Sequence, residues 1–276
     1  MTAPAPYQQP GASYASPIPV RKAHLGDAIA SEWTKIRSVR STMWTLGVMI
    51  MLIIGSALSI GVLAAGAGAE GGVEQEASAL GFGFFGVLLG SLCVITLGVL
   101  TIASEFGTGM IRTTLTACPT RERVLAAKAI VFFALVFVIT ALTSAFAGLI
   151  LTGLVSAPSA GVGEWLRSTV GVGAFVALLG LLGLSLGTII RHSAGAITVM
   201  VGVMLLPLVS AMFMMSQRLA DLQNWLLNYS IPSQIVALYG DIGPDGPQGW
   251  EPLWIMLGVT GVVLAGAFAS LHNRDA

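Results

Sequence analysis

The sequence contains little charge. Only 9% of its 276 residues are Asp, Glu, Lys or Arg, whereas 55% are apolar. A soluble domain carries about 25% charged residues, so this chain cannot cover a water-facing surface, and lipid must surround much of it. The formal net charge is zero, which gives no basic field for nucleic acid. We therefore expect no nucleic-acid partner.

Cysteine and histidine are also scarce. The two cysteines, Cys93 and Cys118, form no C-x-x-C pair, which argues against a disulfide framework or a zinc–thiolate site. His24, His192 and His272 are far apart in the sequence and lie near the ends of apolar segments. We interpret them as interfacial side chains, and we expect no metal and no cofactor.

The sequence also lacks a nucleotide-binding loop. G-x-x-x-x-G-K-[ST] does not occur, and no lysine follows a glycine. The chain therefore cannot bind ATP through a P-loop. No clustered nucleophile or carboxylates near an interface indicate catalysis, so we expect no catalytic residues. If ATP is hydrolysed, a partner subunit must do it.

What the sequence does contain is six long apolar segments. Each has about 20 residues or more, enough to cross a hydrocarbon core of roughly 30 Å as a helix. None contains an acid, a Lys, an Arg or a His, which disfavours an ion-coupled carrier. The prediction is an all-α polytopic membrane protein with spans at 44–65, 80–103, 129–155, 168–190, 194–215 and 252–271.

The basic residues indicate the orientation of these spans. With both termini in the cytoplasm, the inside loops hold eleven of the thirteen Lys and Arg residues, and only Arg167 and Arg218 lie outside. Positive residues accumulate on the cytoplasmic side of membrane proteins. We therefore predict cytoplasmic N- and C-termini, in the plasma membrane of a bacterial cell.

Two regions precede the first span. Residues 1–20 hold five prolines and no charge, and we interpret them as a disordered tail. In residues 21–43, four apolar side chains recur at helical spacing, followed by Lys35, Arg37 and Arg40. This pattern predicts an amphipathic helix in the membrane interface, beside anionic lipid. A soluble helix that packs on a cytoplasmic loop is the alternative. The four apolar residues are Leu25, Ile29, Trp33 and Ile36.

Two further patterns describe the transmembrane region, residues 44–276. Residues 216–251 show two short runs of apolar residues separated by Pro232, which predicts two external helices in or on the outer leaflet. Gly86 and Gly90, and Gly183 and Gly187, have the small-x-x-x-small spacing of close helix contacts. We interpret both pairs as packing within the bundle, with a dimer interface as the lesser alternative.

The most polar internal stretch joins the second and third spans, at 104–128. The segment EFGTGMIRTTLTACPTRERVLAAK contains four basic residues, two acids and two glycines. Gly107 and Gly109 allow a bend after the second span, and Thr120 is a candidate helix N-cap. The pattern predicts a short helix, a turn and a second helix, which present fixed charges to the cytoplasm.

This stretch, from Glu105 to Lys128, resembles the cytoplasmic segment of ABC-2 type transporter permeases. SEWTKIRS, from Ser31 to Ser38, is similar to the helix that precedes span one in that family. The resemblance covers about residues 24–272. It implies the permease subunit of an ATP-driven exporter, with a separate ATP-binding cassette subunit as its partner. It also implies a homodimer or a paired permease, because six spans are too few for the usual translocation path.

In that family, the segment between spans two and three is a coupling helix that docks on the ATP-binding subunit. The helix before span one also touches that subunit, and here its candidate contacts are Glu32 and Lys35. An ATP-independent channel or scaffold is the alternative function. The sequence does not identify the cargo, although apolar spans without a charged pocket favour a lipophilic one. The resemblance assigns coupling roles to Glu105, Gly107, Thr108, Arg112, Pro119, Arg121, Arg123 and Lys128.

Overall fold

A computed structural model describes residues 24–71, 78–110, 120–155, 158–214, 217–240 and 246–273. Within these ranges the chain forms helices and no strand, which confirms the all-α prediction. The Pro-rich tail lies outside the described residues. The helices are α1 (Leu25–Ser38), α2 (Arg40–Gly71), α3 (Phe84–Gly107), α5 (Arg121–Leu154), α6 (Val162–Leu166), α7 (Val172–Ile190), α8 (Ser193–Phe213), α9 (Ala220–Asn228), α10 (Ile231–Tyr239) and α11 (Glu251–Asn273), with single turns η1 (Ala79–Gly83), η2 (Arg167–Gly171) and η3 (Gln217–Leu219).

Six of these helical segments are long and apolar enough to cross a membrane, as predicted. They contain α2, α3, α5, α7, α8 and α11. Several begin earlier than the hydropathy pattern indicates: α2 begins at Arg40 instead of 44, and α5 at Arg121 instead of 129. Hydropathy detects only the part of a helix that suits hydrocarbon, whereas backbone hydrogen bonding continues through the polar flanks. The chain is a multi-pass membrane protein.

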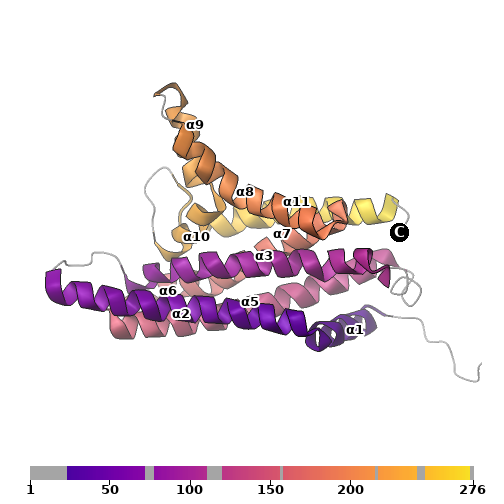
Figure 1. The fold of residues 1–276 in the computed structure, drawn as a ribbon, viewed down its shortest axis with the longest axis horizontal. Helices are drawn as coiled ribbons and strands as arrows, with labels where there is room; N and C mark the ends of the chain where they lie inside the picture. Colours follow the sequence, from indigo (N-terminus) through magenta and orange to yellow (C-terminus); the bar gives the residue numbers. More distant parts are fainter. Residues whose placement is uncertain are drawn as a thin grey trace, which may run out of the picture.

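Helix α7 is the centre of the bundle. It packs against α3, α5, α8 and α11, and nearly every side chain from Val172 to Thr188 is buried. A helix that is apolar on all sides is covered either by neighbouring helices or by lipid, and here neighbouring helices cover it. Figure 1 shows α7 between the layer of α2, α3 and α5 and the layer of α8 and α11.

The contact between α3 and α7 depends on glycine. A Cβ at Gly98 would overlap the carbonyl oxygen of Gly180, and one at Gly187 would lie 3.1 Å from the carbonyl oxygen of Val99. Small residues let helix backbones approach closely in lipid, where dispersion replaces the hydrophobic effect. Gly183 and Gly187 face α3, whereas Gly86 and Gly90 face α2, so both pairs pack within the bundle, as we interpreted.

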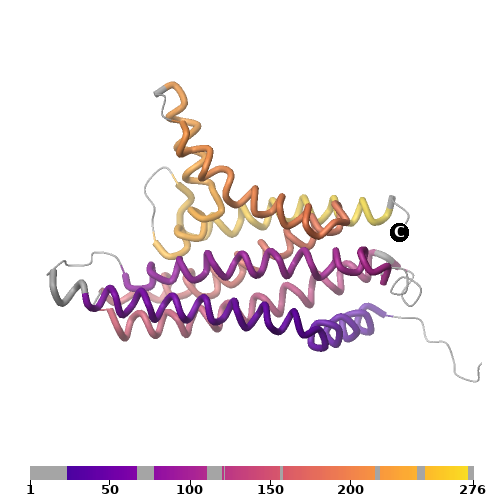
Figure 2. Tube along the Cα trace, in the orientation of Figure 1, coloured from indigo at the N-terminus to yellow at the C-terminus, as the bar shows by residue number. Residues whose placement is uncertain are grey.

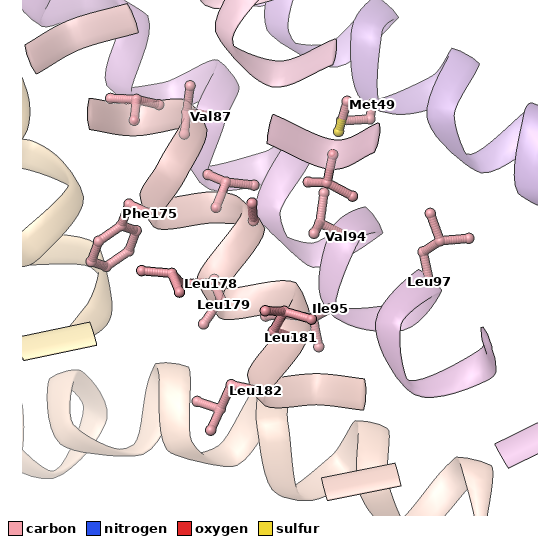
Figure 3. Close-up of a cluster of buried hydrophobic side chains, with 14 of the residues drawn as sticks. Met49, Val87, Val94, Ile95, Leu97, Phe175, Leu178, Leu179, Leu181 and Leu182 are labelled. Atoms are coloured by element: carbon pink, nitrogen blue, oxygen red, sulfur yellow. The ribbon is translucent and has the colours of Figure 1, made fainter. Parts of the chain in front are cut away.

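Branched and aromatic side chains fill the spaces beside these glycines. Leu179 and Ile95 are fully buried, as is Phe175. Figure 3 shows these three with Val94, Leu182 and other core side chains between neighbouring helices. Close backbones and interlocked side chains together make the α3–α7 contact densely packed.

The two ends of the bundle differ. Helix α1, the start of α2 and the C-terminal end of α11 lie at one end, while α9 and α10 lie at the other (Figures 1 and 2). The two short helices between α8 and α11 form as predicted. Pro232 lies in the first turn of α10, where its missing N–H costs no helical hydrogen bond. Helix α10 is largely buried against the bundle, whereas α9 is exposed beside α8.

Candidate functional site

The two flanks of the charged stretch meet at the α1 end. Helix α3 ends at Gly107, and Gly109 has a φ of 71°, a left-handed conformation that glycine adopts without strain. Helix α5 begins after Thr120, which occupies the N-cap position, although its side chain makes no capping hydrogen bond. The predicted bend and helix start are therefore present. Residues 111–119 lie outside the described part of the chain.

Four ionised side chains join these flanks to α1. Lys128 Nζ on α5 lies 2.6 Å from Glu32 Oε2 and 2.9 Å from Glu105 Oε1. Lys35 Nζ lies 2.8 Å from Glu32 Oε1 and 3.2 Å from Glu105 Oε1. Each lysine therefore bridges the carboxylate of α1 and the carboxylate of α3. We call Glu32, Lys35, Glu105 and Lys128 the ion cluster.

Most of the ion cluster is buried. Lys128 is 1% exposed, Glu32 3% and Glu105 6%, while the side chain of Lys35 retains 30% exposure. Burial of an ionised group costs roughly several kcal/mol of hydration free energy. Only opposite charges with good hydrogen bonds offset that cost. The cluster has two charges of each sign. Removal of one buried member therefore leaves the others without compensation.

The charges within the cluster stabilise each other. Burial alone would raise the pKa of Glu32, but the positive charge and hydrogen bonds of Lys128 and Lys35 outweigh it, and the pKa lies below its ordinary value. Burial alone would lower the pKa of Lys35, but its bonds to Glu32 and the charge of Glu105 raise it instead. Both groups are thus ionised at neutral pH.

The sequence of α1 explains how this helix docks. His24 begins it with a capping box, in which Asp27 accepts from the backbone N–H of His24 at 2.9 Å. Glu32 and Ile36, one turn apart, face the bundle and are buried. Trp33 is 44% exposed. The predicted apolar face is therefore divided between the bundle and the surroundings.

Two more contacts reach the same end of the bundle. The guanidinium of Arg191, in the short turn between α7 and α8, lies 5.1 Å from the ring centroid of Phe106, a cation–π contact. His272 Nδ1, near the end of α11, lies 3.6 Å from Glu122 Oε1. Neither contact was predicted. Arg191 has a φ of 56°, a backbone conformation that residue spacing does not reveal.

The structure separates the ten predicted site residues into groups. Four form the ion cluster, so their charged atoms contact each other, and of the four only Lys35 keeps substantial exposure. Gly107, Thr108 and Arg123 are exposed beside the cluster. Arg121 lies in the first turn of α5, and Arg112 and Pro119 fall outside the described residues. The sequence placed all ten in one region, but it did not distinguish internal from external contacts.

The site contains no arrangement suited to catalysis among the residues that the structure describes. Its role is structural: charge-assisted hydrogen bonds link α1, α3 and α5, which are far apart in the sequence. These ion pairs link the end of α3 to the start of α5, and they attach α1 to both helices.

Comparison with known proteins agrees with this architecture. The model of the ABC-2 family transporter proteins matches residues 28–207, which is well over half of the chain and includes most of α1, the ion cluster, the first four spans and most of the fifth. None of the curated proteins matches the chain significantly. On the strength of the family match, the fold and the six spans, this chain belongs to the ABC-2 family of transporter membrane proteins.

Proposed function

We propose that the chain is the permease subunit of an ATP-driven bacterial exporter, and that residues 104–128 couple it to a separate ATP-binding cassette subunit. The observation that carries this proposal is the ion cluster. It connects both flanks of the coupling segment to α1 through buried pairs of opposite charge.

Ion pairs that link three helices in this way would transmit force between them. A partner that pushes on residues 108–120 moves the end of α3 and the start of α5 together, since Lys128 binds Glu105 across them. Helix α1 follows because Glu32 binds the same lysine. The Arg191–Phe106 contact extends this unit to the α7–α8 turn. A push at one place therefore reaches four of the six spans.

The contact surface for the ATPase lies beside the cluster. Arg123 is exposed on the first turn of α5, and Gly107 and Thr108 are exposed at the end of α3. A guanidinium forms paired hydrogen bonds with a carboxylate, so Arg123 suits an acidic patch on the partner. In this division of roles, Glu32, Lys35, Glu105 and Lys128 give stiffness and Arg123 gives recognition.

The rest of the assembly follows from the family and the surface. The outward faces of α2, α8 and α11 carry exposed apolar side chains, including Trp44 at 76% and Trp254 at 70%. Lipid and a second permease, either another copy of this chain or a related one, would cover these faces. We propose a lipophilic cargo, exported from a cell whose cytoplasm contains both termini.

Co-purification tests the coupling. The full chain is expressed with a candidate ATP-binding cassette subunit from the same organism, and complex recovery and ATPase activity are measured. Arg123→Glu should lower both about tenfold or more, because it replaces attraction by repulsion. Arg218→Glu, an exposed arginine near α9, is the matched control and should change neither. Unaltered complex and activity in Arg123→Glu would contradict the coupling assignment.

Thiol labelling tests the orientation. In a Cys93→Ser background, Cys118 is the single thiol of the chain. An impermeant maleimide should label it only after the cells are permeabilised, because residues 104–128 are assigned to the cytoplasm. Labelling in intact cells would place the coupling segment outside, beyond the reach of an ATPase.

A further inference from the structure

A cavity lies between α1, the start of α2 and the last turns of α3. Its volume is about 450 Å³, within the range of roughly 300–1,000 Å³ that small-molecule sites occupy. Helix α1 and the ends of two spans border it, which is where lipid head groups meet a membrane protein. Its lining comprises the ion cluster, five apolar residues and seven hydroxyl side chains.

The hydroxyl groups present acceptors to this cavity. Five of them donate their hydrogen to a carbonyl of their own helix at 2.6–2.9 Å: Ser38, Thr45, Thr101, Ser104 and Thr108. A hydroxyl that has donated its hydrogen retains only lone pairs for a ligand. The wall therefore suits a molecule with hydrogen-bond donors.

Glu105 adds a negatively charged acceptor to the neutral hydroxyl groups. Its Oε1 accepts from both lysines, but its Oε2 is buried without a hydrogen-bond partner among the described residues. Glu105 lines the cavity and is only 6% exposed. A buried carboxylate oxygen without a donor costs free energy. A ligand that brings donor hydrogens to this end of the cavity removes that cost.

The remaining lining is apolar. Leu97 and Leu100 extend the cavity along α3 toward the membrane interior, and Val39 closes it beside α1. A hydrocarbon chain in contact with these residues would leave water or remain in a lipid-like environment. The cavity thus has an acceptor-rich polar end and an apolar end.

We propose that this cavity binds the primary ammonium group of an amphipathic molecule, with its apolar part along Leu97 and Leu100. The ammonium groups of Lys35 and Lys128 in the lining are already paired with Glu32 and Glu105, so the unpaired groups that a ligand meets are acceptors, which disfavours an anion. A quaternary ammonium has no N–H for Glu105 Oε2. Two sources supply the required chemistry, namely an ethanolamine lipid of the bilayer and a free amphipathic amine. The proposal needs the chain in a membrane, but it does not depend on an ATPase partner.

The test uses the full-length chain. It is reconstituted in nanodiscs of equal parts phosphatidylethanolamine, phosphatidylcholine and phosphatidylglycerol, released into detergent, and examined for retained lipid by native mass spectrometry. In a second arm the delipidated chain is titrated with dodecylamine and, for comparison, with dodecanol. Preferential retention of phosphatidylethanolamine identifies the lipid source. Preference for dodecylamine over dodecanol without that retention identifies a free amine.

Two variants separate binding from folding. Thr101→Phe fills the cavity and leaves the ion cluster intact, and it should weaken retention or amine affinity about tenfold. Leu149→Phe on the exposed face of α5 is the matched control and should bind as the parent does. Glu105→Gln, which replaces the unpaired oxygen or its neighbour by an amide, should also lose the preference for ammonium.

Three results would overturn the proposal. The first is equal retention of the three lipids together with equal affinity for dodecylamine and dodecanol. The second is preferential retention of phosphatidylglycerol. The third is unchanged binding in Thr101→Phe, because a ligand outside the cavity is insensitive to its filling. None of these outcomes bears on whether Arg123 contacts an ATPase.

Discussion

The two ends of the bundle are held together by different forces. At the α1 end, four ionised side chains join three helices, and Lys128 is 1% exposed. At the α10 end, the contacts are mainly apolar: Ile235 and Leu238 are fully buried between η1, η2 and the spans. Polar contacts there include the bond from Gln234 Nε2 to the carbonyl oxygen of Tyr229 at 2.8 Å, which is local in the sequence. They also include the bond from Ser78 Oγ to Glu164 Oε1, which links the residue before η1 to α6 with one carboxylate instead of four ionised groups.

This difference indicates how each end responds to force. Apolar packing has no specific partner atoms, since it depends on buried area. A cluster of ion pairs has defined partners and distances, so displacement of one helix breaks or exchanges specific contacts. Under the proposed coupling, the α1 end is the one that transmits a push from the partner. Four changes test this contrast.

The largest expected effect comes from Lys128→Met. The substitution leaves the buried carboxylates of Glu32 and Glu105 without their shared ammonium, which should cost about 3–5 kcal/mol. Thermal unfolding in detergent measures the loss, and hydrogen exchange should show α1 detached. A melting curve within experimental error of the parent would mean that the cluster does not hold α1.

Ile235→Ala at the opposite end should cost about 2–5 kcal/mol, because it leaves a cavity in apolar packing. The loss should be independent of salt. Hydrogen exchange should increase in α10 and η1 and remain unchanged in α1. Increased exchange in α1 would show that the two ends are not independent.

The pH dependence of stability should also differ between the two ends, because the ion cluster lies at the α1 end. The pKa of Glu32 is below its ordinary value of 4.5, so its stabilising contribution is fully present above 4.5 and is lost as the pH falls through the lower folded-state value. The pKa of Lys35 is above 10.5, so its contribution is present below 10.5 and is lost as the pH rises through the raised value. Glu32→Gln should therefore destabilise the chain at neutral pH, and its difference from the parent should shrink in acid.

Melting temperatures of parent and Glu32→Gln across the acid range measure this convergence. Asp221→Asn, on exposed α9, controls for the loss of a carboxylate elsewhere. If the parent and Glu32→Gln curves stay parallel in acid, ionisation of Glu32 is not what stabilises the α1 end.

The smallest effect is expected from Lys35→Met. Its ammonium contacts the same two carboxylates as Lys128, but its side chain is 30% exposed, so water replaces much of the lost interaction. We expect about 1 kcal/mol or less, measured in the same unfolding assay. Both lysines contact the same two carboxylates, so the ratio of the two losses in unfolding free energy measures how much burial strengthens the interaction.

Much of the fold could be predicted from the sequence because the membrane restricts it. Apolar runs of span length can only be helices in lipid, and the two short helices before α11 followed from spacing and Pro232. Helix ends could not be predicted as well. Arg40 and Arg121 begin helices that hydropathy alone starts later, because polar flanks carry no hydropathy signal.

The sequence identified the region of the candidate site, but it did not show which of its residues contact each other. The charged residues of 104–128 were conspicuous beside apolar spans, and Glu32 and Lys35 were assigned through the family. That Glu32 and Lys128, 96 residues apart, share a buried hydrogen bond depends on how α1 packs against α5, which no local pattern encodes. A lysine next to a span normally indicates a charge at the membrane surface, so Lys128 gave no sign of its burial.

The central position of α7 also bears on biogenesis. By the time α7 leaves the ribosome, α3 and α5, against which Gly180 and Gly187 pack, have already been made. Helices α8 and α11 arrive later and enclose it from the other side. Synthesis from the N-terminus therefore makes the innermost helix after its neighbours on one side and before its neighbours on the other, so α7 need not enter between two layers that are already packed.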